Sequence, residues 1–98
     1  MIVSAVLGEK NPELGIEKNK TTKAELVQAL KDAFAYSDKA YDTMTDAQAA
    51  QMASFFGRQQ TKLFILSLNT GHDNEHYGNM VTYLRMKGIV PPSSEPRK

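Results

Sequence analysis

The fold is decided by residues 60–92, which read QTKLFILSLNTGHDNEHYGNMVTYLRMKGIVPP. Apolar residues such as Ile65 and Leu68 recur here at the three- and four-residue spacing that places side chains on one face of a helix. Gly88, followed by an isoleucine and two prolines, is typical of a helix end, because glycine readily adopts the left-handed conformation and proline cannot continue the helix. The stretch therefore predicts one long helix over about residues 60–87.

A second helix is predicted upstream of this stretch. Thr22 and Glu25 have the spacing of a capping box, in which the two residues satisfy each other's free backbone N–H groups. An apolar stripe at helical spacing follows this cap: Leu26, Val27, Leu30, Ala33, Phe34 and Tyr41. We therefore expect a helix over about residues 23–42.

The remaining segments give shorter signals. Residues 1–7 are apolar and read as the end of a helix or as a short strand. Thr45 and Gln48 form a weaker capping pattern, which predicts a short helical segment. Phe55 and Phe56 cannot both point inward from one helix, so we expect a turn that buries at least one of them. No convincing strand pattern is present, and the predicted fold class is all-α.

Length and composition limit the class of protein. The 98 residues are enough for one domain, which we place at residues 1–92, followed by a disordered tail at residues 93–98. Lys and Arg number 12 against 11 Asp and Glu, so the chain lacks the strong positive charge typical of a nucleic-acid binder. There are no cysteines, which excludes disulfides, thiolate metal ligands and a cysteine nucleophile.

Hydropathy gives no sign of a membrane protein. No apolar run approaches the roughly 20 residues that span a bilayer. The apolar first residues lack the basic segment that opens a signal peptide. The expected location is therefore the cytoplasm.

The most informative residues are the two histidines of the chain. His72 and His76 are four residues apart on the predicted last helix, so their rings lie on one face and can converge on one divalent metal ion. Apolar neighbours on the same face predict that the pair points toward the interior of a helical bundle. Three nearby residues could orient the rings or line the site: Asn69, Asn79 and Tyr83.

Other interpretations of the pair stay open. Two helical histidines are often plain surface or core residues, and a catalytic zinc usually has three protein ligands. Asp73 and Glu75 face away from the pair on a helical wheel, so neither easily supplies a third ligand. The same letters also spell H-x-x-E-H, the inverted zincin motif with Glu75 as base, although such peptidases need a much larger fold.

One family shares this pattern. The combination His72-Asp73-x-x-His76-x-Gly78, followed by VTYLRMKGIVPP at residues 81–92, resembles the C-terminal helix of the DinB superfamily of DinB/YfiT-like metalloenzymes. The resemblance extends back over most of the chain.

This resemblance implies a four-helix bundle with a three-histidine site that holds zinc or nickel. Members of the family are described as damage-inducible proteins, hydrolases or thiol-dependent transferases. His72 and His76 match the two C-terminal ligands of the family. The remaining ligand lies in an earlier helix for which this chain has no counterpart, so the chain resembles roughly the C-terminal two-thirds of a family member and an incomplete bundle.

An incomplete bundle predicts a partner. Leaving its apolar faces in water would cost several kcal/mol, at roughly 25 cal/mol per Å² of apolar area. We therefore expect a homodimer that completes the bundle between subunits. The predicted function is divalent-metal binding, with hydrolase or thiol-transferase activity on a small-molecule substrate. The alternative is a non-catalytic dimerising helical module in which the histidines are a remnant.

Overall fold

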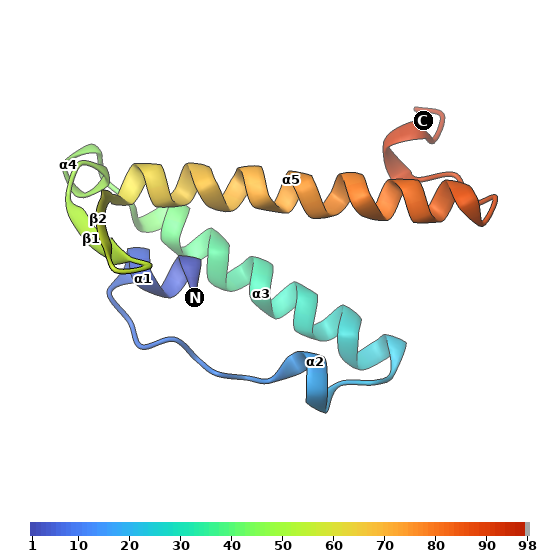
Figure 1. The fold of residues 1–98 in the computed structure, drawn as a ribbon, viewed down its shortest axis with the longest axis horizontal. Helices are drawn as coiled ribbons and strands as arrows, with labels where there is room; N and C mark the ends of the chain where they lie inside the picture. Colours follow the sequence, from blue (N-terminus) through green and yellow to red (C-terminus); the bar gives the residue numbers. More distant parts are fainter. Residues whose placement is uncertain (98) are drawn as a thin grey trace. The chain divides into compact units, whose positions relative to one another are not determined.

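A computed structural model describes residues 1–97, and Lys98 lies outside the described residues. The chain is mostly helical, which confirms the predicted all-α class (Figure 1). It divides into two compact units, Met1–Leu66 and the residues from Ser67 onward, which are described separately below. The elements are α1 (Ile2–Leu7), α2 (Ile16–Asn19), α3 (Lys23–Thr43), α4 (Asp46–Ala49), β1 (Met52–Phe55), β2 (Arg58–Thr61), α5 (Lys62–Met86) and a 3-10 turn, η1 (Pro92–Ser94).

Helix α3 begins at the predicted capping box. The Glu25 backbone N–H donates to Thr22 Oγ1 at 3.2 Å, and the Thr22 N–H donates to Glu25 Oε2 at 3.1 Å. These two bonds satisfy N–H groups that have no partner inside the helix. The Thr22 and Thr21 N–H groups also hold the pKa of the Glu25 carboxyl below its usual value. The prediction of a helix over about residues 23–42 is confirmed to within one residue at its end.

The second predicted cap is also present. The Gln48 N–H donates to Thr45 Oγ1 at 3.2 Å, and the Thr45 N–H donates to Gln48 Oε1 at 3.1 Å. Helix α4 is nevertheless a single turn, Asp46–Ala49. A cap fixes where a helix begins, but it does not decide how far the helix continues.

No strands are predicted from the sequence, and this prediction is wrong for residues 52–61. Strands β1 and β2 pair antiparallel, with Met52 opposite Thr61 and Phe55 opposite Arg58. The turn between them consists of Phe56 and Gly57, which have φ values of 50° and 73°. Two successive positive φ values match the right-handed twist of a tight hairpin, and glycine adopts them without steric cost.

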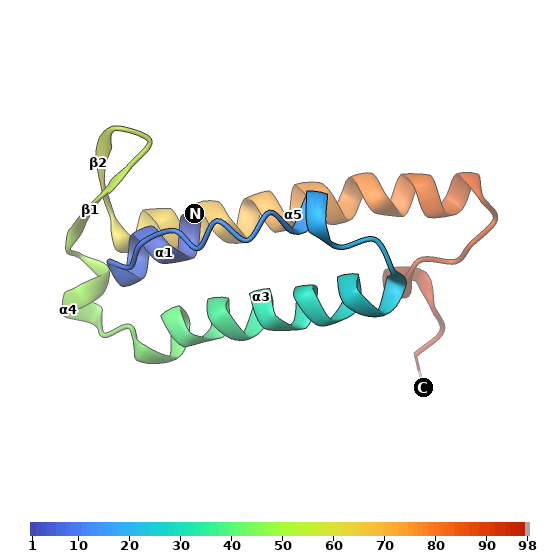
Figure 2. The same cartoon turned by 90° about the horizontal axis from the view of Figure 1, so that it is seen from below.

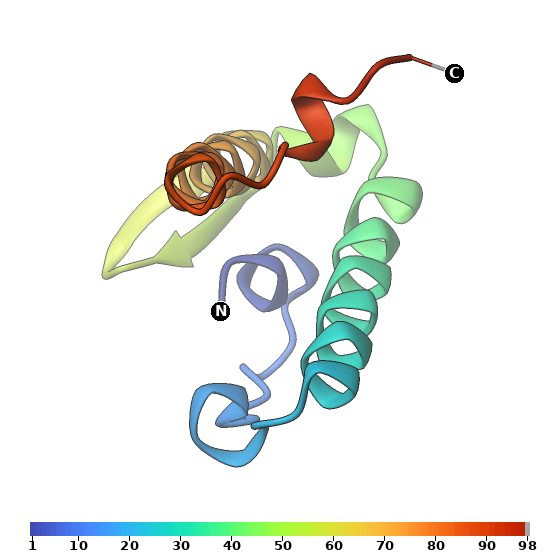
Figure 3. The ribbon, with the colours of Figure 1, turned by 90° about the vertical axis from the view of Figure 1, so that its right-hand side faces the viewer.

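The core of the Met1–Leu66 unit gathers around α1. Its buried apolar residues are Val6, Ala40, Phe55, Ile65 and Leu66. Figure 3 shows α1 between α3 and the hairpin, and this position lets one short helix contact both. The Phe55 side chain is only 7% exposed whereas Phe56 is 75% exposed. The expectation that at least one of the two phenylalanines is buried is therefore confirmed.

Most of the predicted apolar stripe on α3 stays in contact with water. Leu30 is 59% exposed and Phe34 is 55% exposed, and Leu26 and Val27 are exposed as well. Ala40, near the end of the helix, is fully buried in the core. The C-terminal end of α3 is therefore anchored by packing, while its earlier turns present an apolar face to solvent.

The long last helix and its end follow the sequence closely. Helix α5 covers Lys62–Met86, against the predicted residues 60–87. Gly88 has a φ of 70°, and the Ile89 N–H donates to the Leu84 carbonyl at 3.0 Å. The Gly88 N–H donates to the Arg85 carbonyl at the same distance. This is the Schellman arrangement that the Gly-Ile-x-Pro-Pro ending predicts.

Beyond α5 the chain turns back (Figure 2). The tail that the sequence predicts to be disordered starts at Ser93, and the structure has a 3-10 turn at Pro92–Ser94. The Ser93 N–H donates to the Tyr77 hydroxyl at 3.1 Å, and Arg85 Nη2 donates to Ser94 Oγ at 2.9 Å. Two side chains of α5 thus hold the start of this segment, and Lys98 lies outside the described residues.

Candidate metal centre

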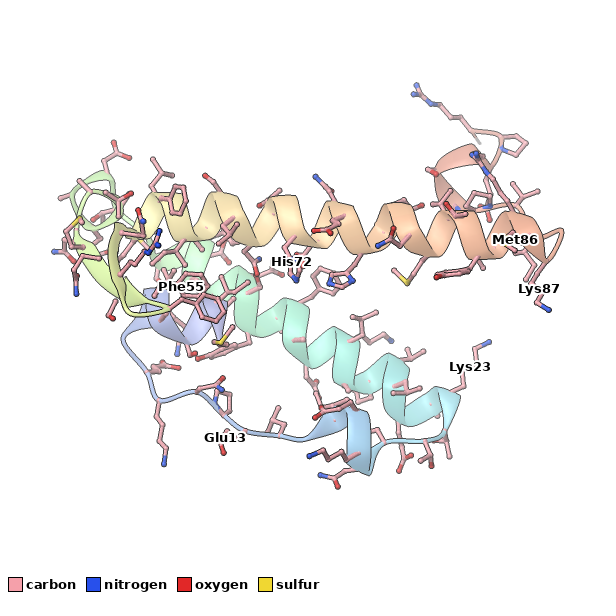
Figure 4. All side chains as sticks on the ribbon, in the orientation of Figure 1. Glu13, Lys23, Phe55, His72, Met86 and Lys87 are labelled. Carbon is pink, nitrogen blue, oxygen red and sulfur yellow. The ribbon has the colours of Figure 1, made fainter. Side chains whose placement is uncertain are left out.

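His72 and His76 lie in the middle of α5, one helical turn apart. Figure 4 labels His72 on this helix. His72 Nε2 and His76 Nε2 are 3.1 Å apart. The ring centroids are separated by 4.4 Å, and the ring planes cross at 78°. The Nε2 atoms therefore approach each other closely without the rings stacking face to face.

This spacing can be tested against the geometry of a metal site. Two bonds of about 2.0–2.1 Å from one metal ion place their nitrogen atoms about 2.9 to 3.4 Å apart, for bond angles between 90° and the tetrahedral value. The observed 3.1 Å lies inside this range. The donor chemistry also fits, because neutral imidazole is a common ligand of zinc and nickel.

Glu75 contacts the pair from its outer side. Its Oε2 atom lies 3.4 Å from Nδ1 of His72, three residues earlier on the same helix. Nδ1 and Nε2 are on different sides of the imidazole ring, so this carboxylate is not placed where a metal held by both Nε2 atoms would lie. Glu75 is therefore not placed as a third ligand of such an ion.

The surroundings of the pair differ from the expected bundle interior. Residues 71–80 are all exposed, and the side chain of His72 is 50% exposed. Leu68 and Met80, the apolar neighbours on either side, are exposed too. Leu68 and Met80 each lie one helical turn from a histidine. This spacing does not determine whether another surface covers the histidine pair.

The three residues expected near the site lie on the same helix. Asn69 is half-buried and stands three residues before His72, whereas Asn79 is exposed and stands three residues after His76. Tyr83 is exposed and lies one turn further along α5. Their roles in orienting or lining the site stay predictions.

The described residues do not bring a third metal ligand to the pair. Among residues 1–97, no group of three or more His, Cys, Asp or Glu side chains is arranged to hold a metal ion. The pair thus offers two imidazole ligands on an open helical surface. The contact between Glu75 and His72 was not predicted from the sequence. The i,i+3 spacing of the two residues was the signal that could have indicated it.

Comparison with known protein families gives one clear result. The model of the DinB family matches residues 3–98. The chain belongs to the DinB family. The resemblance seen in the residues around His72 and His76 is thereby confirmed. No curated protein and no solved structure matches the chain.

Membership of the DinB family agrees with the mostly helical structure. The match to the family model covers nearly the whole chain. In the described part of this DinB-family chain, no helix is both long enough and apolar enough to cross a membrane.

Proposed function

We propose that this DinB-family chain binds a divalent metal ion through Nε2 of His72 and Nε2 of His76. The observation that carries the proposal is the 3.1 Å separation of these atoms, which suits two ligands of one ion. The choice of zinc or nickel follows from the imidazole donors and from family membership.

The other protein ligand or ligands come, in this proposal, from a second subunit. A catalytic zinc site usually has three protein ligands and one open position. The exposed apolar face of α3 supports a homodimer, because soluble monomers rarely leave a contiguous apolar surface uncovered. In a two-fold dimer, each subunit would contribute the same residues to the shared surface.

The activity that fits such a centre is hydrolysis or thiol transfer on a small-molecule substrate. A bound divalent ion would supply Lewis acidity and make a coordinated nucleophile available at neutral pH. The half-exposed position of His72 leaves room for ligands from outside the chain. The two histidines would hold the ion and fix its position on α5.

The alternative is a non-catalytic dimerising module with a remnant site. The open position of the pair and the lack of a three-residue metal cluster in residues 1–97 favour it. Under this alternative, the 3.1 Å contact is only a hydrogen bond between two imidazoles.

The test is metal content per chain, measured by elemental analysis on tag-free protein purified without chelator. We expect near-stoichiometric zinc or nickel in the wild type and its loss in His72→Ala. Asn74→Ala, an exposed change in the same helix turn, is the matched control and should keep the metal. Metal-free wild type that also fails to take up added zinc or nickel would refute the proposal and favour the remnant module.

A further inference from the structure

We infer that Glu75 is a positioning residue, which fixes the tautomer of His72 so that Nε2 of that ring carries the free lone pair. The inference rests on the proposed metal binding for its purpose. The tautomer itself is a property of the metal-free chain and can be measured without any metal.

Glu75 and His72 contact each other on the surface of α5. An ionised carboxylate can only accept hydrogen bonds, so a carboxylate oxygen 3.4 Å from Nδ1 favours the tautomer with its proton on Nδ1. The two residues are three apart on α5 and therefore neighbours on the helix surface. At 3.4 Å the attraction is between the negative charge of the carboxylate and the N–H dipole of the ring.

The imidazole rings of the two histidines also contact each other. Nε2 of His72 and Nε2 of His76 are 3.1 Å apart, so in the neutral, metal-free pair one nitrogen donates and the other accepts. If His72 keeps its proton on Nδ1, its Nε2 is the acceptor and His76 donates from Nε2–H. The ring contact allows either arrangement, and the Glu75 contact selects the one in which Nε2 of His72 accepts.

The consequence for metal binding follows from the requirement that a ligand nitrogen carries no proton. His72 already meets this requirement at Nε2, whereas His76 must move its proton to Nδ1. A carboxylate hydrogen-bonded to the far nitrogen of a ligand imidazole also orients the ring and raises its basicity. Glu75 would therefore make His72 the ligand that is ready to bind first.

The size of the effect is limited by exposure. The side chain of Glu75 is 69% exposed, so water competes for its carboxylate. Loss of such an outer partner typically weakens metal affinity 10- to 100-fold, and we expect about tenfold here.

The decisive experiment reads the tautomer directly. Long-range ¹H–¹⁵N correlation spectra of the metal-free, ¹⁵N-labelled chain, recorded at about pH 8 where imidazoles are neutral, distinguish Nδ1–H from Nε2–H. We expect Nδ1–H on His72 and Nε2–H on His76 in the wild type. Glu75→Ala should shift His72 toward Nε2–H, and Glu75→Gln, which keeps an acceptor oxygen, should shift it less.

Asp73→Ala is the matched control, since it removes a carboxylate of the same charge from the same turn without touching this contact. It should leave both tautomers unchanged. Nε2–H on His72 in the wild type, or the same tautomer in wild type and Glu75→Ala, would overturn the inference.

A zinc titration by calorimetry separates this inference from the proposed function. If the wild type binds zinc and Glu75→Ala binds about tenfold more weakly, both stand. Equal affinities would overturn the role of Glu75 in metal binding. If the wild type does not bind zinc or nickel, the proposed function fails, and the tautomer spectra still decide whether Glu75 fixes His72.

Discussion

At the scale of single residues, Gly71 and Gly88 illustrate two different reasons for a glycine. Gly88 has a φ of 70° and ends α5, whereas Gly71 lies inside the same helix. Apart from its two chain neighbours and the backbone of its own helix, a Cβ atom added at Gly71 would meet no atom within 4 Å. Gly88 is required by the backbone conformation, whereas Gly71 is not required by packing within the described chain.

Gly71→Ala should therefore stabilise the chain. Alanine loses less conformational entropy than glycine in a helix interior, so we expect the free energy of unfolding to rise by about 0.5–1 kcal/mol. Gly88→Ala is the control, and it should lower the free energy of unfolding by about 1–2 kcal/mol because its φ is left-handed. Urea unfolding followed by circular dichroism measures both; a destabilised Gly71→Ala would show that this glycine has a packing role.

At the scale of elements, Glu9 ties the segment after α1 to α3. Its Oε1 accepts from Lys39 Nζ and its Oε2 accepts from the Tyr36 hydroxyl, each at 2.7 Å. The hydrogen bonds from Lys39 and then Tyr36 hold the pKa of Glu9 below its usual value. The same contact raises the pKa of Tyr36, because the carboxylate stabilises the protonated phenol.

The contact between Glu9 and Tyr36 makes the stability of the chain depend on pH at both ends of the scale. Because the folded-state pKa of Glu9 is lowered, its contribution to stability is complete above the ordinary value of 4.5 and is lost as pH falls through the folded-state value. Because the pKa of Tyr36 is raised, its contribution is complete below 10.0 and is lost as pH rises through the folded-state value. The tie should therefore weaken at both extremes.

Glu9→Gln should flatten the acid side of this profile. In Glu9→Gln we expect the midpoint urea concentration of unfolding to fall less between about pH 6 and pH 3 than it does in the wild type. Some pH dependence should remain, because the pKa of Glu25 is lowered as well. Glu13→Gln, an exposed change in the same loop, is the matched control and should keep the wild-type slope. An unchanged slope in Glu9→Gln would mean that the tie does not contribute.

What the sequence could predict is also clearest at this scale. The bounds of α3 and the end of α5 follow from local signals, namely the Thr22 capping box and Gly88. The hairpin was missed because Arg-Gln-Gln-Thr in β2 has no alternating apolar pattern, and because Phe-Gly replaces the usual Asn-Gly turn. Strand pairing is a non-local interaction, which local patterns describe poorly.

The site divides in the same way. The approach of His72 to His76 follows from their four-residue spacing on a helix. The contact of Glu75 depends on side-chain rotamers, which a helical wheel does not specify. The open surroundings of the pair depend on which other surfaces cover α5, and no residue of α5 encodes that alone.

At the scale of the whole molecule, the exposed apolar surface leads to the prediction of a dimer. Light scattering after size exclusion at micromolar concentration should give about twice the chain mass of 10.9 kDa. Leu30→Lys and Phe34→Lys should each shift the mass toward that of the single chain, since both side chains are more than half exposed on the α3 face.

Ala35→Lys is the matched control, because it introduces the same lysine at an exposed position on another side of α3. It should leave the mass unchanged. A wild-type chain that is monomeric throughout this range would refute the dimer and remove the proposed source of a further metal ligand.

Helix α5 has buried side chains near its start, at Ile65 and Leu66, and continues through residues 71–80, which are all exposed. Backbone amides in its first turns should therefore exchange with deuterium slowly, and those around the histidines should exchange faster, because local opening there exposes little new apolar surface. The proposed centre thus lies in a part of the helix that should open more readily than its first turns. Binding of a metal ion or a second subunit would therefore stabilise a segment of α5 that few buried contacts hold in the isolated chain.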